Sequence, residues 1–206
     1  MGILLPVFCM IASTLNYPAD TVKSGITIYY PPFITEENVW VDSVMNTLSI
    51  DQKIGQLLMY PAYSNKDTEH EDYIKTLIYD YRIGGLIFMQ GDPISQVNLL
   101  NQYQNISDIP LLIAMDAEWS LSMRLKNTIL YPRQMMLGAI QDNELIYEMG
   151  AEFARQLKLV GAHVNFAPVA DVNNNSKNPV INCRSFGEDI MNVSEKSYYY
   201  MKGMQD

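Results

Sequence analysis

Residues 84–116 read GGLIFMQGDPISQVNLLNQYQNISDIPLLIAMD, and this stretch decides the fold class. Its two apolar runs, 86–89 and 111–115, are short and uninterrupted, which is typical of strands buried on both faces of a parallel sheet. Between them, Asp92 and Pro93 predict the N-cap and the first position of a connecting helix. The stretch therefore predicts a strand, a covering helix and a second strand parallel to the first.

The same alternation continues on both sides of this stretch. In chain order we expect a helix over 36–48, a helix opened by a Ser49–Gln52 capping box, a strand at 57–59, a helix over 69–82, a helix from Asp142 to Gly161, a strand over 164–169 and a helix from about Asn192. About four strand–helix units fit this order, whereas a complete (β/α)8 barrel takes ~250 residues. A doubly wound sheet and part of a barrel both satisfy the pattern. No G-x-G-x-x-G sequence occurs, which disfavours a dinucleotide-binding sheet.

The first 35 residues differ in composition from the rest of the chain. Residues 2–12 (GILLPVFCMIA) are apolar but too short for a membrane-spanning helix, which takes ~20 residues, so no stable membrane insertion is expected. We interpret residues 1–16 as the leader of an exported, periplasmic or cell-envelope protein, with a structureless terminus as the alternative. Residues 17–35 contain three prolines and predict an extended linker, which leaves 36–206 as the folded domain.

The charge balance and the few cysteines and histidines exclude several classes of function. The net charge is -9 at pH 7 and Lys and Arg do not cluster, so nucleic-acid binding, which needs a basic surface, is not expected. Cys9 falls in the leader, which leaves Cys183 without a partner for an internal disulfide. His70 and His163 are the only histidines and lie far apart in the sequence, so we expect no metal site and no cofactor.

Carboxylates follow two of the predicted strands at the points where these strands end. Asp116 and Glu118 follow the second strand quoted above, and Asp171 follows the last one. Because barrel active sites lie at the C-terminal ends of strands, these carboxylates are placed to accept hydrogen bonds from sugar hydroxyls. Arg124 and Arg184 come shortly after the same strands and can donate to the same ligand.

Each of these residues also has a purely structural interpretation. Asp171 is equally well explained as the N-cap of a following helix, and Glu118 as the partner of a neighbouring arginine that holds its loop. Trp119 offers a face for sugar stacking, whereas the asparagines at 173–175 are typical of a turn. His163 lies among apolar residues and is better explained as a hydrogen-bonded core residue than as a catalyst. From chemistry alone, both interpretations of the strand ends stay open.

Four segments carry a specific resemblance to a known family. IAMDAEWSLSMRL (113–125) resembles the D-x-E-x-G loop of family 3 glycoside hydrolases, in the form common among bacterial β-N-acetylhexosaminidases. NFAPVADVNNNSKNPVINCRSFGED (165–189) is similar to that family's second hallmark, an N-F-A-P-V-x-D-V strand followed by R-S-F-G. IGGLIFMQG (83–91) and LSIDQKIGQLLM (48–59) match earlier barrel segments in the same order, so the similarity covers about residues 37–206.

The resemblance implies a fold and a division of roles along the barrel. The fold is α/β, the N-terminal part (about four βα units) of a TIM (β/α)8 barrel, and the missing C-terminal half of the barrel is the implied partner. The family's sugar-binding aspartate and two arginines fall on Asp116, Arg124 and Arg184. The nucleophile and the histidine acid/base of the retaining mechanism are expected downstream of Asp206. No catalytic group is therefore expected within this chain, and the fragment alone should be inactive.

The implied reaction is hydrolysis of β-linked N-acetylglucosamine in peptidoglycan or chitin-type fragments. A family 3 β-glucosidase or xylosidase and a non-catalytic carbohydrate-binding remnant are the alternatives. Ser120 and Ser122 stand where relatives usually carry glycine, and serine adopts positive φ less readily, so the Asp116 loop is expected to differ locally. A half-barrel also exposes two sheet edges and half of its core, which predicts association, aggregation or partial disorder in isolation.

Overall fold

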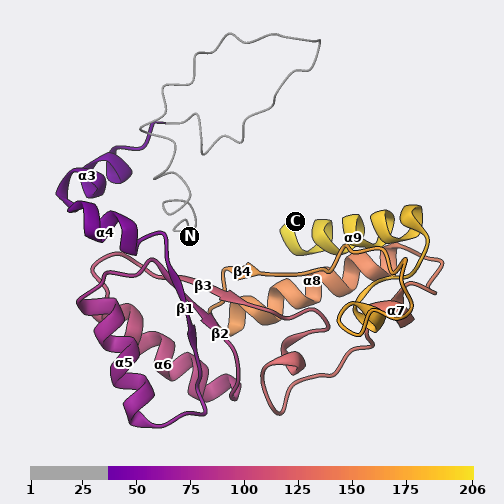
Figure 1. The fold of residues 1–206 in the computed structure, drawn as a ribbon, viewed down its shortest axis with the longest axis horizontal. Helices are drawn as coiled ribbons and strands as arrows, with labels where there is room; N and C mark the ends of the chain where they lie inside the picture. Colours follow the sequence, from indigo (N-terminus) through magenta and orange to yellow (C-terminus); the bar gives the residue numbers. More distant parts are fainter. Residues whose placement is uncertain (1–36) are drawn as a thin grey trace.

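The folded part of the chain is built around one sheet of four parallel strands (Figure 1). The computed structural model describes residues 37–206, so the predicted leader and linker lie outside the described residues. The strands are β1 (Met59–Ala62), β2 (Gly85–Phe88), β3 (Leu112–Met115) and β4 (Val164–Asn165), hydrogen-bonded in the order β1-β2-β3-β4. Neighbouring strands are all parallel and helices separate them along the chain. This confirms the predicted α/β fold with four strand–helix units.

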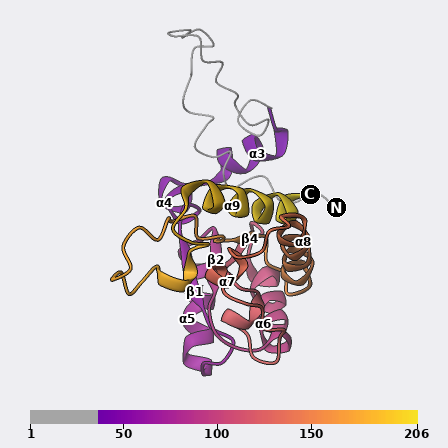
Figure 2. The same ribbon diagram turned by 90° about the vertical axis from the view of Figure 1, so that its right-hand side faces the viewer.

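Helices cover the sheet on one side and extend beyond its β4 edge. The α-helices are α3 (Val39–Thr47), α4 (Ile50–Gly55), α5 (Thr68–Tyr79), α6 (Pro93–Ile106), α7 (Gln134–Leu137), α8 (Glu144–Leu159) and α9 (Ile190–Gln205), and the 3₁₀ helices are η1 (Leu121–Met123) and η2 (Asn182–Arg184). Figures 1 and 2 show α5 beside α6 along the sheet, and α8 beside α9 as a second pair. The loops that follow the strands therefore lie between the α5–α6 pair and the α8–α9 pair.

Two helix starts agree with the capping signals in the sequence. The Ser49 side chain accepts a hydrogen bond from the Gln52 N–H while the Gln52 side chain accepts one from the Ser49 N–H, so the predicted capping box is formed. Asp92 Oδ1 accepts from the amides of Ile94 and Ser95, and Pro93 occupies the first position of α6. Local capping chemistry thus sets where α4 and α6 begin.

Two strand boundaries differ from the prediction, and hydrogen bonding explains both. Leu57 and Leu58 were expected in β1, but their amides donate to carbonyls of α4 and complete its last turn, so β1 starts at Met59. The strand expected over 164–169 ends at Asn165. β4 has a strand neighbour on one side only among residues 37–206, and Pro168 has no N–H with which to extend the pairing.

Two helix boundaries also differ. Asp142 was expected to cap α8, but the capping position is Asn143, and Asp142 Oδ1 instead accepts from the Glu144 N–H. The helix expected over 69–82 ends at Tyr79, so Tyr81 lies outside it and is exposed rather than on its buried face. Such shifts of one to three residues are common at helix ends.

The main core lies between the sheet and the α5–α6 pair. Leu86, Phe88, Ile113 and Met115 alternate along β2 and β3 and are almost completely buried. They pack with residues such as Ile74 from the inner face of α5. Because successive strand residues point to opposite faces, this alternation assigns one sheet face to the helices.

A second core joins α8 to α9. Its buried residues are Leu137, Ile146, Met149, Phe153, Phe186, Val193 and Tyr200. The two helices approach each other closely at Gly150 and Gly203. A Cβ added to Gly203 would lie 2.0 Å from the backbone oxygen of Tyr147, so only glycine fits at this contact. The tight contact holds α9 in a fixed position relative to the strand ends.

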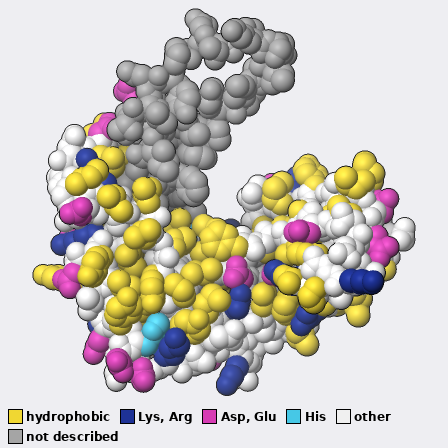
Figure 3. Space-filling model, viewed as in Figure 1, with side chains coloured by type: hydrophobic (Ala, Val, Ile, Leu, Met, Phe, Trp, Pro, Cys, Tyr) yellow, Lys and Arg dark blue, Asp and Glu magenta, His cyan; other side chains and the backbone are white. Residues whose placement is uncertain are grey.

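The opposite face of the sheet is covered much less completely. Met59, Pro61, Ile87, Leu112 and Val164 share this face by register and are partly or fully exposed, whereas Gly85 and Ala114 on the same face are buried. Figure 3 shows hydrophobic side chains gathered over the β1–β2 part of the molecule. An apolar surface of this kind suits the inner face of a barrel.

None of the helices described between residues 37 and 206 has the length and apolar character needed to cross a membrane.

Candidate functional site

Asp116 and Arg124 form an ion pair at the C-terminal end of β3. Arg124 Nη2 donates to Asp116 Oδ2 at 2.7 Å, and its Nε donates to the Asp116 backbone oxygen at 3.1 Å. The Asp116 side chain keeps 28% of its exposure and that of Arg124 keeps 14%, so solvent still reaches the pair. Within the described residues, Asp116 Oδ1 and Arg124 Nη1 make no hydrogen bond. Both atoms are therefore available to a polar ligand.

A second ion pair joins Glu118 to Arg184 across 66 positions of sequence. Arg184 Nη2 donates to Glu118 Oε1 at 2.7 Å and Nε to Oε2 at 3.0 Å, while Nη1 donates to the Val180 carbonyl. The Glu118 side chain is only 4% exposed. The structure thus supports the interpretation that Glu118 holds its loop through an arginine, and most of the Arg184 fork is already occupied.

The two ion pairs lie in one electrostatic neighbourhood. The hydrogen bonds that Arg184 donates to the Glu118 carboxylate are the main cause that raises the pKa of Arg184, and the charges of Asp171 and Asp116 act in the same direction. Three carboxylates and two guanidinium groups therefore gather at the ends of β3 and β4. The structure brings together the predicted Asp116, Arg124 and Arg184.

Other residues singled out in the sequence have more limited roles. Asp171 is exposed and a loop follows it, so the interpretation as a helix N-cap is wrong. The Arg133 guanidinium lies over the Trp119 ring, 4.3 Å from its centroid, so one face of the ring already contacts a cation. Asn175 Oδ1 accepts from the Lys177 N–H in the turn that the asparagine run predicted.

Ser120 adopts a backbone conformation that strongly favours glycine. Its φ is 89° and its ψ 179°, and its side chain is buried. The Ser120 hydroxyl donates to the Ile129 carbonyl at 2.6 Å and accepts from the Ser122 N–H at 3.2 Å. The chain thus keeps the positive φ expected of a glycine at this position and offsets part of its cost with side-chain hydrogen bonds.

This conformation predicts an unusual order of stability among substitutions. Ser120→Gly relieves backbone strain, whereas Ser120→Ala keeps the strain and loses the hydroxyl, so the glycine variant should be more stable by about 1 to 2 kcal/mol. At Ser122, which has no positive φ, alanine should be at least as stable as glycine. Urea unfolding of the four variants measures both orders. The same order at the two serines would contradict the assignment of strain to Ser120.

Both histidines accept hydrogen bonds from backbone amides. His163 Nδ1 accepts from the Ile113 N–H at 3.0 Å, and His70 Nε2 accepts from the Tyr63 N–H at 3.2 Å. Desolvation of these ring edges is the main cause that lowers the pKa of each histidine. His163 is hydrogen-bonded as expected, but it is exposed and not in the core, because β4 lies at the sheet edge.

The two histidines predict a loss of stability in mild acid. A pKa lowered in the folded state means that the unfolded chain binds more protons below its own histidine pKa, which is about 6.5. The contribution of the two neutral histidines to the free energy of unfolding is complete above pH 6.5, and it is lost as the pH falls below that value. Urea unfolding at pH 7.5 and 5.5 should show this loss, and a His70→Gln/His163→Gln variant should show a smaller one. An equal loss in both proteins would contradict the assignment.

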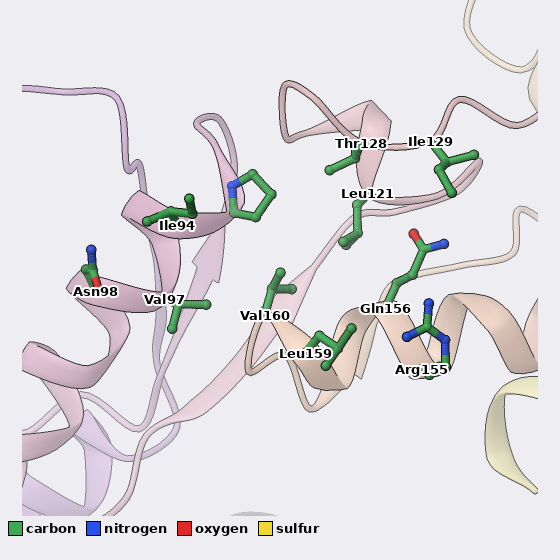
Figure 4. Close-up of a pocket in the computed structure, with 11 residues that line it drawn as sticks. Ile94, Val97, Asn98, Leu121, Thr128, Ile129, Arg155, Gln156, Leu159 and Val160 are labelled. Carbon is green, nitrogen blue, oxygen red and sulfur yellow. The ribbon is translucent and has the colours of Figure 1, made fainter.

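A cavity of about 470 Å³ lies behind the Asp116 loop, between α6 and α8 (Figure 4). Its lining is mostly apolar and includes Ile94, Leu121, Ile129 and Leu159. None of the four residues of the ion pairs lines it. Among residues 37–206, no group of three or more metal-ligating side chains is placed to hold a metal ion.

Comparison with known proteins identifies the family. The Glycosyl hydrolase family 3 N-terminal domain matches residues 49–206. The chain belongs to glycoside hydrolase family 3. The resemblance of the Asp116 loop and of the R-S-F-G segment to this family is thereby confirmed.

A curated β-hexosaminidase and a solved family 3 structure are similar to this chain. Beta-hexosaminidase A of Pseudoalteromonas piscicida is 31% identical over 199 residues, which cover 84% of this chain and 33% of that protein. The structure of a family 3 β-N-acetylglucosaminidase from Paenibacillus sp. str. FPU-7 superposes with a TM-score of 0.69 and 33% identity, over 78% of this chain and 31% of that one.

A more distant structure shows the shared fold. The β-glucoside phosphorylase BglX superposes with a TM-score of 0.75 at 23% identity, over 81% of this chain and 30% of that one. The chain spans about a third of the length of each of these three proteins.

Three side chains that touch the site were not singled out from the sequence. They are Asn165 at the end of β4, Gln134 in α7 and Tyr200 in α9, and each bonds to the backbone of Ala117 or Glu118. Asn165 alone carried a usable signal, since it is the polar residue in the otherwise apolar run VNFAPV.

Proposed function

We propose that this chain forms the sugar-binding half of a retaining β-N-acetylhexosaminidase that cleaves β-linked N-acetylglucosamine from peptidoglycan or chitin-type fragments. The observation that carries the proposal is the solvent-accessible Asp116–Arg124 pair at the end of β3, next to Arg184. Its family membership and the β-hexosaminidase names among its relatives support the reaction class.

The chemistry of the pair suits a neutral, hydroxyl-rich ring. Asp116 Oδ1 accepts from a sugar hydroxyl, and Arg124 Nη1 donates to the same or a neighbouring hydroxyl, so both bonds are charge-assisted. Mutual pairing keeps the local charge low and fixes both side chains before the ligand arrives. A preorganised ring position of this kind lowers the entropy cost of reaching the transition state.

The covalent chemistry is assigned to the complementary half of the barrel. A retaining glycosidase needs a carboxylate nucleophile and an acid/base on either side of the glycosidic bond. We expect both from the C-terminal half, which would cover the apolar sheet face and the edges of β1 and β4 that have no strand partner among residues 37–206. Asp171 is not assigned as nucleophile, because only its proximity to Arg184 supports such a role. We also infer export to the periplasm or cell envelope from the apolar residues 2–12.

A chimeric barrel tests the proposed function. Residues 37–206 are joined to the remaining barrel units of the Paenibacillus N-acetylglucosaminidase, and hydrolysis of para-nitrophenyl N-acetyl-β-glucosaminide and β-glucoside is compared. The proposal predicts hydrolysis of the first substrate, lost on Asp116→Ala. Preference for the glucoside would favour the β-glucosidase alternative. A folded chimera that hydrolyses neither substrate would favour a binding remnant.

A further inference from the structure

The peptide segment between Asp116 and Glu118 is held on both sides of Ala117 by one side chain. Asn165 Oδ1 accepts from the Ala117 N–H at 2.9 Å, and Asn165 Nδ2 donates to the Ala117 carbonyl at 3.3 Å. This two-point contact imitates a backbone ladder. It continues the β3–β4 pairing beyond Met115, the last paired residue of β3.

The carbonyl of Glu118 is a second fixed point, held from two helices. Gln134 Nε2 from α7 donates to it at 2.6 Å. The hydroxyl of Tyr200 from α9 lies 3.3 Å from the same oxygen and 3.2 Å from the Ala117 oxygen. Both side chains are fully buried, and burial raises the pKa of Tyr200, so its hydroxyl stays a protonated donor. Buried carbonyls without such donors are costly.

We propose that Asn165, Gln134 and Tyr200 are positioning residues for the sugar site. In the part of the chain that the structure describes, none of the three forms a hydrogen bond with the side chain of Asp116 or Glu118, so they act through the backbone between these residues. These hydrogen bonds fix the backbone on both sides of Ala117, and this sets the directions in which the neighbouring side chains extend. The Asp116 carboxylate then faces Arg124, and the Glu118 carboxylate faces Arg184. The inference rests on the proposed function, because it names what sets the geometry of that site.

This arrangement connects the α8–α9 pair to the sugar site. Tyr200 packs in the apolar core between these helices and contacts the Phe153 ring edge to face, at a centroid distance of 5.7 Å. Its hydroxyl is the polar atom that reaches from this core to the strand-end segment. α9 therefore acts on the segment through the hydrogen bonds of this hydroxyl, and not through its general stability.

Tyr200→Phe tests the inference, because it deletes only the hydroxyl. Two control variants match it. Tyr103→Phe alters an equally buried tyrosine in α6 whose hydroxyl has no partner among the described residues, and Val193→Ala destabilises α9 without touching the segment. Hydrogen exchange of the amides at 117–120 is measured in the 206-residue chain, together with the Kd for N-acetylglucosamine.

Tyr200→Phe should differ from both control variants in amide exchange at 117–120 and in sugar affinity. At equal global stability, amide exchange at 117–120 should be about tenfold faster in Tyr200→Phe than in Val193→Ala, and the Kd for N-acetylglucosamine should rise about fivefold. Tyr103→Phe should change neither quantity. Equal exchange in Tyr200→Phe and Val193→Ala would overturn the positioning role. If the unaltered chain binds no sugar, the proposed function fails, while the exchange comparison still decides the positioning role.

Discussion

Replacing Arg184 with alanine is expected to lower the free energy of unfolding by about 3 kcal/mol. The Glu118 carboxylate, whose side chain is only 4% exposed, would stay buried after losing both of its guanidinium donors. The Arg184 side chain is 32% exposed, which places the expected loss at the low end of the range for breaking a buried ion pair. Urea unfolding followed by tryptophan fluorescence measures the change.

Two further variants show whether the burial of Glu118 causes the loss of stability in Arg184→Ala. Arg155 makes the same bidentate contact with Glu152 and lowers its pKa to about 2, but this pair is much more exposed than Glu118, so Arg155→Ala should cost far less stability than Arg184→Ala. In Arg184→Ala/Glu118→Leu the buried charge is absent, so much of the stability should return. Equal small losses of unfolding free energy in Arg184→Ala and Arg155→Ala would contradict the burial of the Glu118 carboxylate.

Asp116→Asn is expected to weaken the binding of N-acetylglucosamine by about tenfold to a hundredfold. The amide has the shape of the carboxylate but loses the charge that strengthens its bonds to Arg124 and to a sugar hydroxyl, and a hydrogen bond to a charged group contributes about 1.5 to 3 kcal/mol. Isothermal titration of the chain with the sugar measures the affinity.

Asp108 provides a matched control for this prediction. It also forms an ion pair with an arginine, Arg82, but both residues precede their strands and so lie at the opposite end of the sheet from Asp116. Asp108→Asn should leave the affinity for N-acetylglucosamine unchanged. A similar loss in both variants would show that the effect is general and not local to the strand end.

Much of the fold is predictable because its signals are local. The capping box at Ser49 and the Asp92–Pro93 pair mark helix starts, and uninterrupted apolar runs mark β2 and β3. The start of β1 and the end of β4 are not local properties. They depend on which backbone groups find partners in α4 and in the neighbouring strand, which no short window of sequence specifies.

The candidate site likewise contains residues that local sequence predicts and residues that it does not. Asp116, Arg124 and Arg184 belong to contiguous motifs and were predicted from them, and the structure brings them together. The contacts that hold the segment were not predictable, because Asn165 and Tyr200 lie 48 and 83 positions from Ala117. Only the packing of the second core shows that they meet.

Chemical-shift mapping of the ¹⁵N-labelled chain during titration with N-acetylglucosamine tests whether the sugar binds at the ends of β3 and β4. Binding at these strand ends requires that the backbone and arginine side-chain signals that move belong to Asp116, Arg124 and Arg184, with smaller changes for glucose. Shifts confined to the cavity between α6 and α8, or no shifts at concentrations of sugar well above the millimolar range typical of weak ligands, would contradict it.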